Sequence, residues 1–127
     1  MLHTQAQDII NNLNDGFSFW FDGTVKTTGY SVGNGAKGIQ TVHNPAAPIF
    51  ACYLVALAAR FEAAGFHGIG GWIDEGILYI DPIHHVVDRD TALFLGRQQN
   101  ELAIFDIAAT DCIETGLRNA FASDASA

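Results

Sequence analysis

The chain has 127 residues, of which 49% are hydrophobic and 11% aromatic, and this composition excludes a disordered protein. Fourteen acidic residues stand against six basic ones, and the net charge of -8 argues against direct nucleic-acid binding, which needs clustered cations. The six basic residues are instead scattered along the chain: Lys26, Lys37, Arg60, Arg89, Arg97 and Arg118.

The first third of the chain predicts one helix followed by three strands. Ile9, Ile10 and Leu13 fall on one face of residues 4–14, as in a short amphipathic helix. Aromatic and β-branched residues, separated by glycine-containing turns, then predict strands at 17–21, 28–32 and 38–42.

An apolar run in the middle of the chain predicts a core helix over residues 45–64. Asn44 before Pro45 suits a helix N-cap followed by the first helical position, and Gly65 suits the position after the C-terminus. The stripe expected to face the core comprises Phe50, Leu54, Leu57 and Phe61. The uncharged part, 45–59, is shorter than the roughly twenty residues that cross a bilayer, so no membrane span is expected.

The second half of the chain predicts a hairpin, a helix and a strand. Two apolar runs, 67–74 and 77–82, meet at the turn formed by Glu75 and Gly76. Asp88 precedes a helical pattern over 89–99 and is predicted to be its N-cap. A strand is predicted at 102–107, a weaker strand pattern lies within 111–117, and the small residues of 121–127 are expected to form a mobile tail.

This order of elements predicts an α+β fold. We expect a mostly antiparallel sheet of about five to six strands with two or three helices packed on it. No internal repeat and no linker divides the chain, so residues 1–120 are interpreted as one domain.

Cysteine usage and the N-terminal segment favour a cytoplasmic protein. Cys52 and Cys112 form no C-x-x-C pattern, so both are expected to be free thiols. The opening "MLHTQAQDIINNL" has no basic region followed by an apolar one, which a signal peptide would have. No cofactor is predicted.

The segment "GNGAKG" (33–38) matches the spacing of a phosphate-binding G-x-G-x-x-G loop. Phosphate binding requires a helix to follow, so that its N-terminal amides meet the phosphate. The residues that follow, "IQTV", have a strand pattern instead, and we interpret the segment as a flexible loop with Lys37 solvated at its tip.

The segment "DPIHHVVDRD" (81–90) allows two interpretations. In the first, it is the end of a strand followed by the helix cap, Asp88. In the second, Asp81, His84 and His85 bind a metal, with Asp74 and His67 as further candidates, although adjacent histidines rarely converge on one ion.

Aromatic residues are concentrated in the predicted strands. Phe17, Phe19, Trp20, Phe21, Tyr30 and Trp72 belong to this group. They could form the core, or some could face a partner protein. Trp20, Tyr30, Trp72, Asp74 and Glu75 are the candidate interaction residues, and the Ala-rich central helix could support a homodimer.

The chain resembles a family of small, mostly uncharacterised α+β proteins and domains of actinobacteria, phages and mobile elements. The resemblance lies in "GFSFWFDGTVKTTGYSV" (16–32) and in "GGWIDEGILYIDPIHHVVDRDTALFLGRQQNELAIFDI" (70–107), which follow the pattern GGWxDxGxxYxD…VxDxxxAxxL…AIxD. It implies structural roles for the turn glycines Gly70, Gly71 and Gly76, for Trp72 and Tyr79 as core aromatics and for Asp88 as the cap, and it does not require His84 or His85.

Two functions from different classes are therefore expected. The first is a non-enzymatic interaction module of phage or mobile-element origin, with an anti-defence role resembling that of anti-CRISPR inhibitors, whose acidic surface binds a basic protein. The second is a small metal-dependent hydrolase that uses the Asp81, His84 and His85 region.

Overall fold

The computed structural model describes residues 1–44, 46 and 49–117, and the tail expected at 121–127 lies outside them. In the described residues, three α-helices and a seven-stranded antiparallel sheet confirm the predicted α+β class. The sheet has more strands than expected because the weak pattern after 110 forms a strand. The elements are α1 (His3–Asn11), β1 (Gly16–Trp20), β2 (Tyr30–Gly33), the 3₁₀ turn η1 (Gly35–Lys37), β3 (Ile39–Val42), α2 (Ala51–Ala63), β4 (Gly68–Asp74), β5 (Ile77–Val86), α3 (Arg89–Gln98), β6 (Ala103–Asp106) and β7 (Asp111–Glu114).

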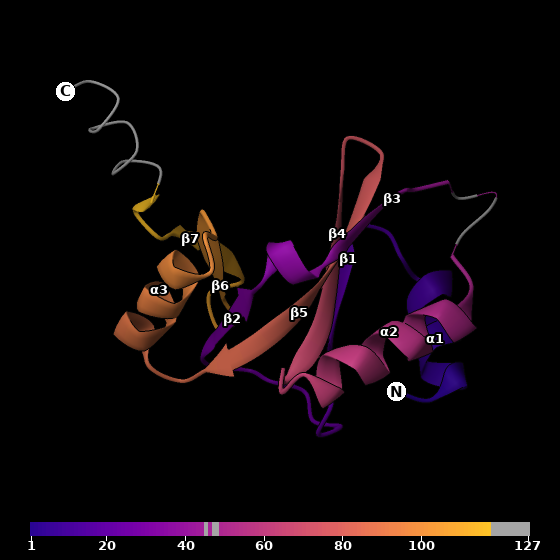
Figure 1. Ribbon diagram of the computed structural model, residues 1–127, viewed down its shortest axis with the longest axis horizontal. Coiled ribbons are helices and arrows are strands. Elements are labelled where there is room, and N and C mark those ends of the chain that lie inside the picture. Colours follow the sequence, from indigo (N-terminus) through magenta and orange to yellow (C-terminus); the bar gives the residue numbers. More distant parts are fainter. Residues whose placement is uncertain (45, 47–48, 118–127) are drawn as a thin grey trace.

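The long strand β5 connects the two ends of the sheet. The strand order is β1-β4-β5-β2-β6-β7. Strands β2 and β3 pair with the same edge of β5, β2 near its C-terminal end and β3 near its N-terminal end. Figure 1 shows α1 and α2 together at one end of the sheet and α3 beside β6 and β7 at the other. Each end of the sheet has its own hydrophobic cluster.

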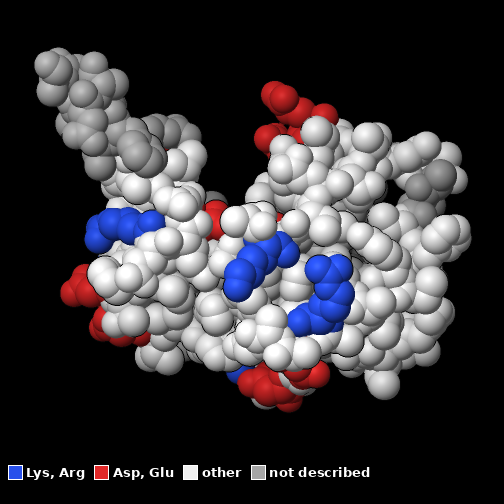
Figure 2. Space-filling view, in the orientation of Figure 1, with Lys and Arg blue, Asp and Glu red and all other residues white. Residues whose placement is uncertain are grey.

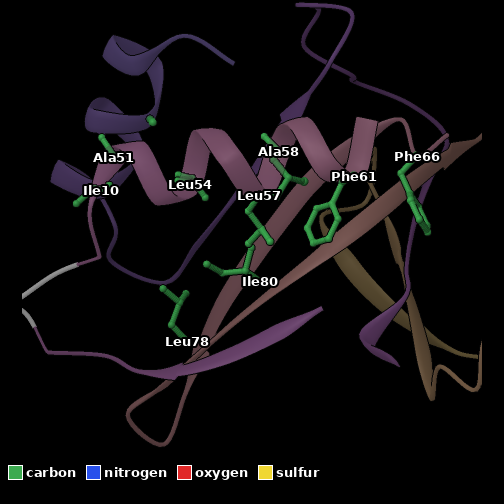
Figure 3. Close-up of a cluster of buried hydrophobic side chains, with 11 residues drawn as sticks. Ile10, Ala51, Leu54, Leu57, Ala58, Phe61, Phe66, Leu78 and Ile80 are labelled. Atoms are coloured by element: carbon green, nitrogen blue, oxygen red, sulfur yellow. The ribbon is translucent and has the colours of Figure 1, made fainter. Parts of the chain in front are cut away.

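The first cluster lies between α1, α2 and the inner face of β4 and β5 (Figure 3). Side chains alternate between the two faces of a strand, so Ile69, Leu78 and Ile80 point to this cluster while their neighbours point to the opposite face. Leu54 and Phe61 are buried against them from α2. We refer to the opposite face as the open face, because α1 and α2 do not cover it.

The second cluster is smaller and holds α3 against β2 and β6. Its buried members are Val32, Ala92 and Ile104. Thr115 closes this end of the sheet, because its hydroxyl donates to the Glu101 carbonyl (2.8 Å) and its own carbonyl accepts from Arg97 Nε (2.6 Å).

The predicted start of the central helix is wrong. Helix α2 begins at Ala51, and its N-cap Phe50 makes no side-chain capping bond. Asn44 instead accepts from the backbone N–H of Ala46 (3.0 Å), a local turn contact. A helix from residue 45 would place Pro48 in its first turns, where proline supplies no N–H and disfavours a helical conformation in the preceding residue.

The apolar stripe of this helix is correspondingly shorter than predicted. Leu54, Leu57 and Phe61 are buried, but the side chain of Phe50 is 77% exposed. Phe50 has an extended backbone conformation before the first helical residue, so the helical spacing does not reach it.

The turns and the end of α2 follow the predictions. Glu75 and Gly76 join β4 to β5 with φ angles of 49° and 76°, as in the two-residue turns whose twist matches that of a hairpin. Gly65 follows α2 with a φ of 92°. Gly71 allows the Phe17 ring to lie on β4, since a Cβ there would be 2.5 Å from Phe17 Cε1.

Candidate functional site

A stacked aromatic pair, an exposed tryptophan and a half-buried tyrosine, lies near the tip of the β4–β5 hairpin. The Trp72 and Tyr79 rings stack with centroids 5.2 Å apart and an interplanar angle of 11°, and Trp72 is 45% exposed. These two residues are register partners and lie on the open face of the sheet. Asp74 and Glu75, whose side chains are exposed, lie between these two residues in the sequence, at the turn of the hairpin. We call these four residues the hairpin surface.

The hairpin that carries the hairpin surface contains no basic Lys or Arg side chain. No Lys or Arg occurs between Arg60 and Arg89 in the sequence. Figure 2 shows acidic atoms at the hairpin tip and the basic side chains of this view elsewhere on the molecule. A positively charged group would therefore meet no repulsion from a neighbouring cation of the hairpin.

Two of the predicted interaction residues pack largely against other parts of the protein. Trp20 is only 7% exposed, with its ring 5.5 Å from that of His85, and a Cβ at Gly68 would lie 2.9 Å from Trp20 Cε3. The glycine thus makes room for the indole. Tyr30 is half-buried and packs against the second cluster. Packing accounts for the positions of Trp20 and Tyr30, and their role in an interaction stays a prediction.

Strand β5, which runs into the segment 81–90, is longer than the predicted strand 77–82. Strand β5 continues to Val86 and includes His84 and His85. Because both are in a strand, their side chains point to opposite faces. His85 is held by a bond from its Nε2 to the Thr28 carbonyl (2.9 Å), and its backbone N–H donates to His67 Nδ1 (2.9 Å).

The candidate metal ligands are consequently not brought together. Asp81 and His84 lie on opposite faces of β5, and Asp74 is at the far end of the hairpin. His84 does meet His67, with ring centroids 5.2 Å apart, but its other neighbour is the Phe66 ring at 4.5 Å. Within the described residues, no group of three or more His, Cys, Asp or Glu side chains could hold a metal ion.

The surroundings of His84 favour its neutral form. Burial lowers the pKa of the imidazole, and the positive charges that His67 and Lys37 can carry lower it further. The Lys37 ammonium lies 5.7 Å from the centre of the Phe66 ring, on the side of the loop that faces this aromatic group. His84 is therefore part of an aromatic contact around Phe66.

Asp88 is the predicted helix cap. Its carboxylate accepts from the backbone N–H of Thr91 (2.8 Å) and from the Thr91 hydroxyl (2.8 Å). The first of these bonds is the larger cause of a lowered pKa for Asp88. The carboxylate of Asp88 therefore caps the N-terminus of α3.

Asp81 is the most unusual acidic residue of the segment. It is 4% exposed, and no described residue donates a hydrogen bond to its carboxylate. Burial, and secondarily the charge of Glu101, raise the pKa of Asp81 to about 6. Burial also raises the pKa of Glu101, and the Gly35 N–H that Glu101 accepts (2.6 Å) opposes that effect.

Glu101 was not singled out by the sequence analysis. It lies in the turn after α3, where Asn100 has a φ of 58°, and it is 20 residues from Asp81. No local pattern links the two residues. Gln99 holds the turn after α3 against the glycine-rich loop. Its amide donates to the Gly33 carbonyl (3.0 Å) and accepts from Asn34 Nδ2 (3.2 Å).

The glycine-rich segment is a loop with a short 3₁₀ turn, and β3 follows it as predicted. The Lys37 ammonium forms no ion pair with a carboxylate of the described residues, where the ion pair found joins Lys26 to Asp22. The amide of Gly35 meets Glu101, a negatively charged side chain of the protein itself. The loop therefore packs on α3 and its C-terminal turn.

A shallow groove of about 360 Å³ lies beside β1. Its lining includes Ser18, Trp20, Ser31 and Phe105, from three strands, and Lys26. The Lys26 ammonium donates to Asp22 and to the Thr24 hydroxyl (2.7 Å), so two of its three N–H donors are already used.

Helices of the described residues are all too short or too polar to cross a membrane. Comparisons with protein-family models, with curated proteins and with solved structures give no match to the chain.

Proposed function

We propose that the protein is a non-enzymatic interaction module that binds a basic protein through the hairpin surface. The observation that carries this proposal is the exposed Trp72 ring, stacked on the half-buried Tyr79, beside two exposed carboxylates. Aromatic residues are enriched at protein interfaces, where they bury a large apolar area while keeping a polar edge.

The chemistry of the surface favours a partner with Arg or Lys side chains. The face of an indole ring attracts a cation, and Asp74 and Glu75 can pair with the same group. The net charge of -8 would also speed the encounter with a basic protein, in a way that salt screens over a Debye length of about 8 Å.

An anti-defence role is the specific form of this proposal that the resemblance to phage and mobile-element proteins suggests. The partner would then be a basic, nucleic-acid-binding effector, and the acidic protein would compete with nucleic acid for it. A homodimer that leaves the hairpin surface free is compatible with this role.

The test is affinity capture followed by direct titration. We expect basic proteins of a host lysate to bind the wild-type protein at low salt and to be lost from the Trp72→Ala and Asp74→Lys variants. The control is Phe94→Ala, which removes an exposed aromatic ring from α3, and α3 lies away from the hairpin tip (Figure 1). Calorimetry with Arg-rich and Glu-rich peptides of equal length should then show binding of the Arg-rich peptide alone.

Two results would contradict the proposal. One is that capture is the same for wild-type, Trp72→Ala and Phe94→Ala proteins, which would place the interaction elsewhere. The other is saturable binding of the purified protein to DNA or RNA on a gel, which would indicate nucleic-acid recognition.

A further inference from the structure

The open face of the sheet contains a recess where the pairing along β5 is interrupted. Strand β2 pairs with β5 up to Gly33, which is opposite Ile83, and β3 resumes the pairing at Ile39, which is opposite Ile80. Asn34 still donates its N–H to the Pro82 carbonyl (3.0 Å), and residues 35–38 then leave the strand edge beside Asp81. Interruptions of this kind re-aim side chains and are often found next to functional sites.

Two carboxylates point into this recess. A Cβ built on Gly33 would lie 3.8 Å from both Asp81 Oδ2 and Glu101 Oε1, and a Cβ on Gly35 would lie 3.8 and 3.5 Å from the same atoms. These are ordinary contact distances, so each glycine leaves room for an added atom between the two acids. The recess is thus a small space bounded by two glycines and two carboxylate oxygens.

The negative charge in the recess has no protein counter-charge. Among the described residues, no Lys, Arg or His nitrogen comes within 4.0 Å of an oxygen of Asp81 or Glu101. Asp81 is 4% exposed and receives no hydrogen bond from the described chain, and neither of its carboxylate oxygens is fully enclosed, so they remain open to a ligand. A buried carboxylate that is neither paired nor hydrogen-bonded is costly, so the recess favours a ligand that is positively charged.

We propose that Asp81 and Glu101 bind a hydrated divalent cation of the hard type, such as Mg²⁺ or Ca²⁺. Hard cations prefer carboxylate oxygens, and Mg²⁺ commonly binds through one or two carboxylates while keeping several waters. This composition explains why the site contains two acidic side chains rather than three or more. It differs from the histidine-containing site considered from the sequence, because His84 and His85 take no part in it.

The proposal does not depend on the hairpin surface. The cation would join the loop 33–38 to the turn after α3, adding to the bond from Gly35 to Glu101. We expect it to stabilise the second cluster and its loops, because a ligand that binds only the folded state raises its stability.

The experiment is calorimetric titration of the full chain, freed of metal with EDTA and dialysed to about pH 7.5, with CaCl₂, MgCl₂ and MnCl₂ separately. We expect one saturable site and a rise in the thermal unfolding midpoint. Asp81→Asn and Glu101→Gln should each weaken binding by about tenfold or more. Asp74→Asn is the matched control, since it removes the same charge from an exposed position and should leave binding unchanged.

Gly35→Ala provides a second variant that keeps both carboxylates and only fills the recess, and it should also weaken binding. Circular dichroism shows whether each variant is folded. The proposal is overturned if wild-type protein binds none of the three ions at millimolar concentration, or if Glu101→Gln and Gly35→Ala bind as tightly as Asp74→Asn.

Discussion

The burial of Asp81 predicts that replacing it by Asn makes the metal-free protein more stable at neutral and alkaline pH. Its pKa is raised from the ordinary 3.8 to about 6, mainly by burial and secondarily by the charge of Glu101. Between these two pH values, the folded protein holds a proton that the unfolded chain has released. Raising the pH through this range therefore favours the unfolded chain.

The magnitude follows from the same two pKa values. The difference between 3.8 and about 6, at about 1.4 kcal/mol for each pH unit, corresponds to a cost of at most about 3 kcal/mol. The stabilising effect of the bound proton is complete below pH 3.8 and is lost as the pH rises through about 6. Asp81→Asn removes the charge and nearly keeps the shape, so its advantage should grow from about zero in acid to about 1–3 kcal/mol at pH 8.

The assay is urea unfolding, followed by circular dichroism, of wild-type and Asp81→Asn proteins at several values from about pH 4 to pH 8. EDTA is present throughout, so that a bound cation does not offset the charge. Asp74→Asn is the control, because its carboxylate is exposed. Parallel curves for wild-type and Asp81→Asn proteins, or a variant less stable than wild type at pH 8, would refute the reasoning.

Two further predictions concern local packing and capping. Asp88→Ala should lower the urea midpoint because α3 loses the acceptor for the Thr91 N–H, whereas Asp88→Asn should keep most of it; equal losses in the two variants would point to charge instead of capping. Gly71→Ala should destabilise by about 1–3 kcal/mol, since its Cβ would be 2.5 Å from Phe17 Cε1, and Gly33→Ala, with no contact closer than 3.8 Å, should change stability little. Urea unfolding of these two glycine variants checks the difference, and similar midpoints would contradict the packing argument.

The local features of this fold could be predicted because a few consecutive residues encode them. The Glu75–Gly76 turn, the Asp88 cap and the glycine after α2 each depend on neighbours within four residues. Alternating and helical apolar patterns likewise placed most elements and indicated the α+β class. The start of α2 was predicted wrongly, although Pro48 was a local signal against a helix beginning at residue 45.

The sequence alone did not determine which aromatic residues are exposed. Trp20 and Trp72 both lie in strands of similar composition, yet the first is buried and the second is not. The difference comes from register and from the neighbour, since Gly68 makes room for the Trp20 ring, whereas Trp72 stacks on Tyr79 near the hairpin tip. The contact between Trp20 and Gly68 joins residues that are about fifty positions apart in the sequence.

Tertiary structure also decided which side chains surround the acidic residues. The strand pattern of β5 puts His84 and His85 on opposite faces and so separates the expected ligand set. The sheet topology brings Glu101 to the glycine-rich loop, with its bond to Gly35 spanning 66 residues. Amino-acid sequence by itself determined most of the elements and the Asp88 cap, because these are short-range. The fold decided the neighbours of Asp81, because burial and charge are set by segments that meet only in three dimensions.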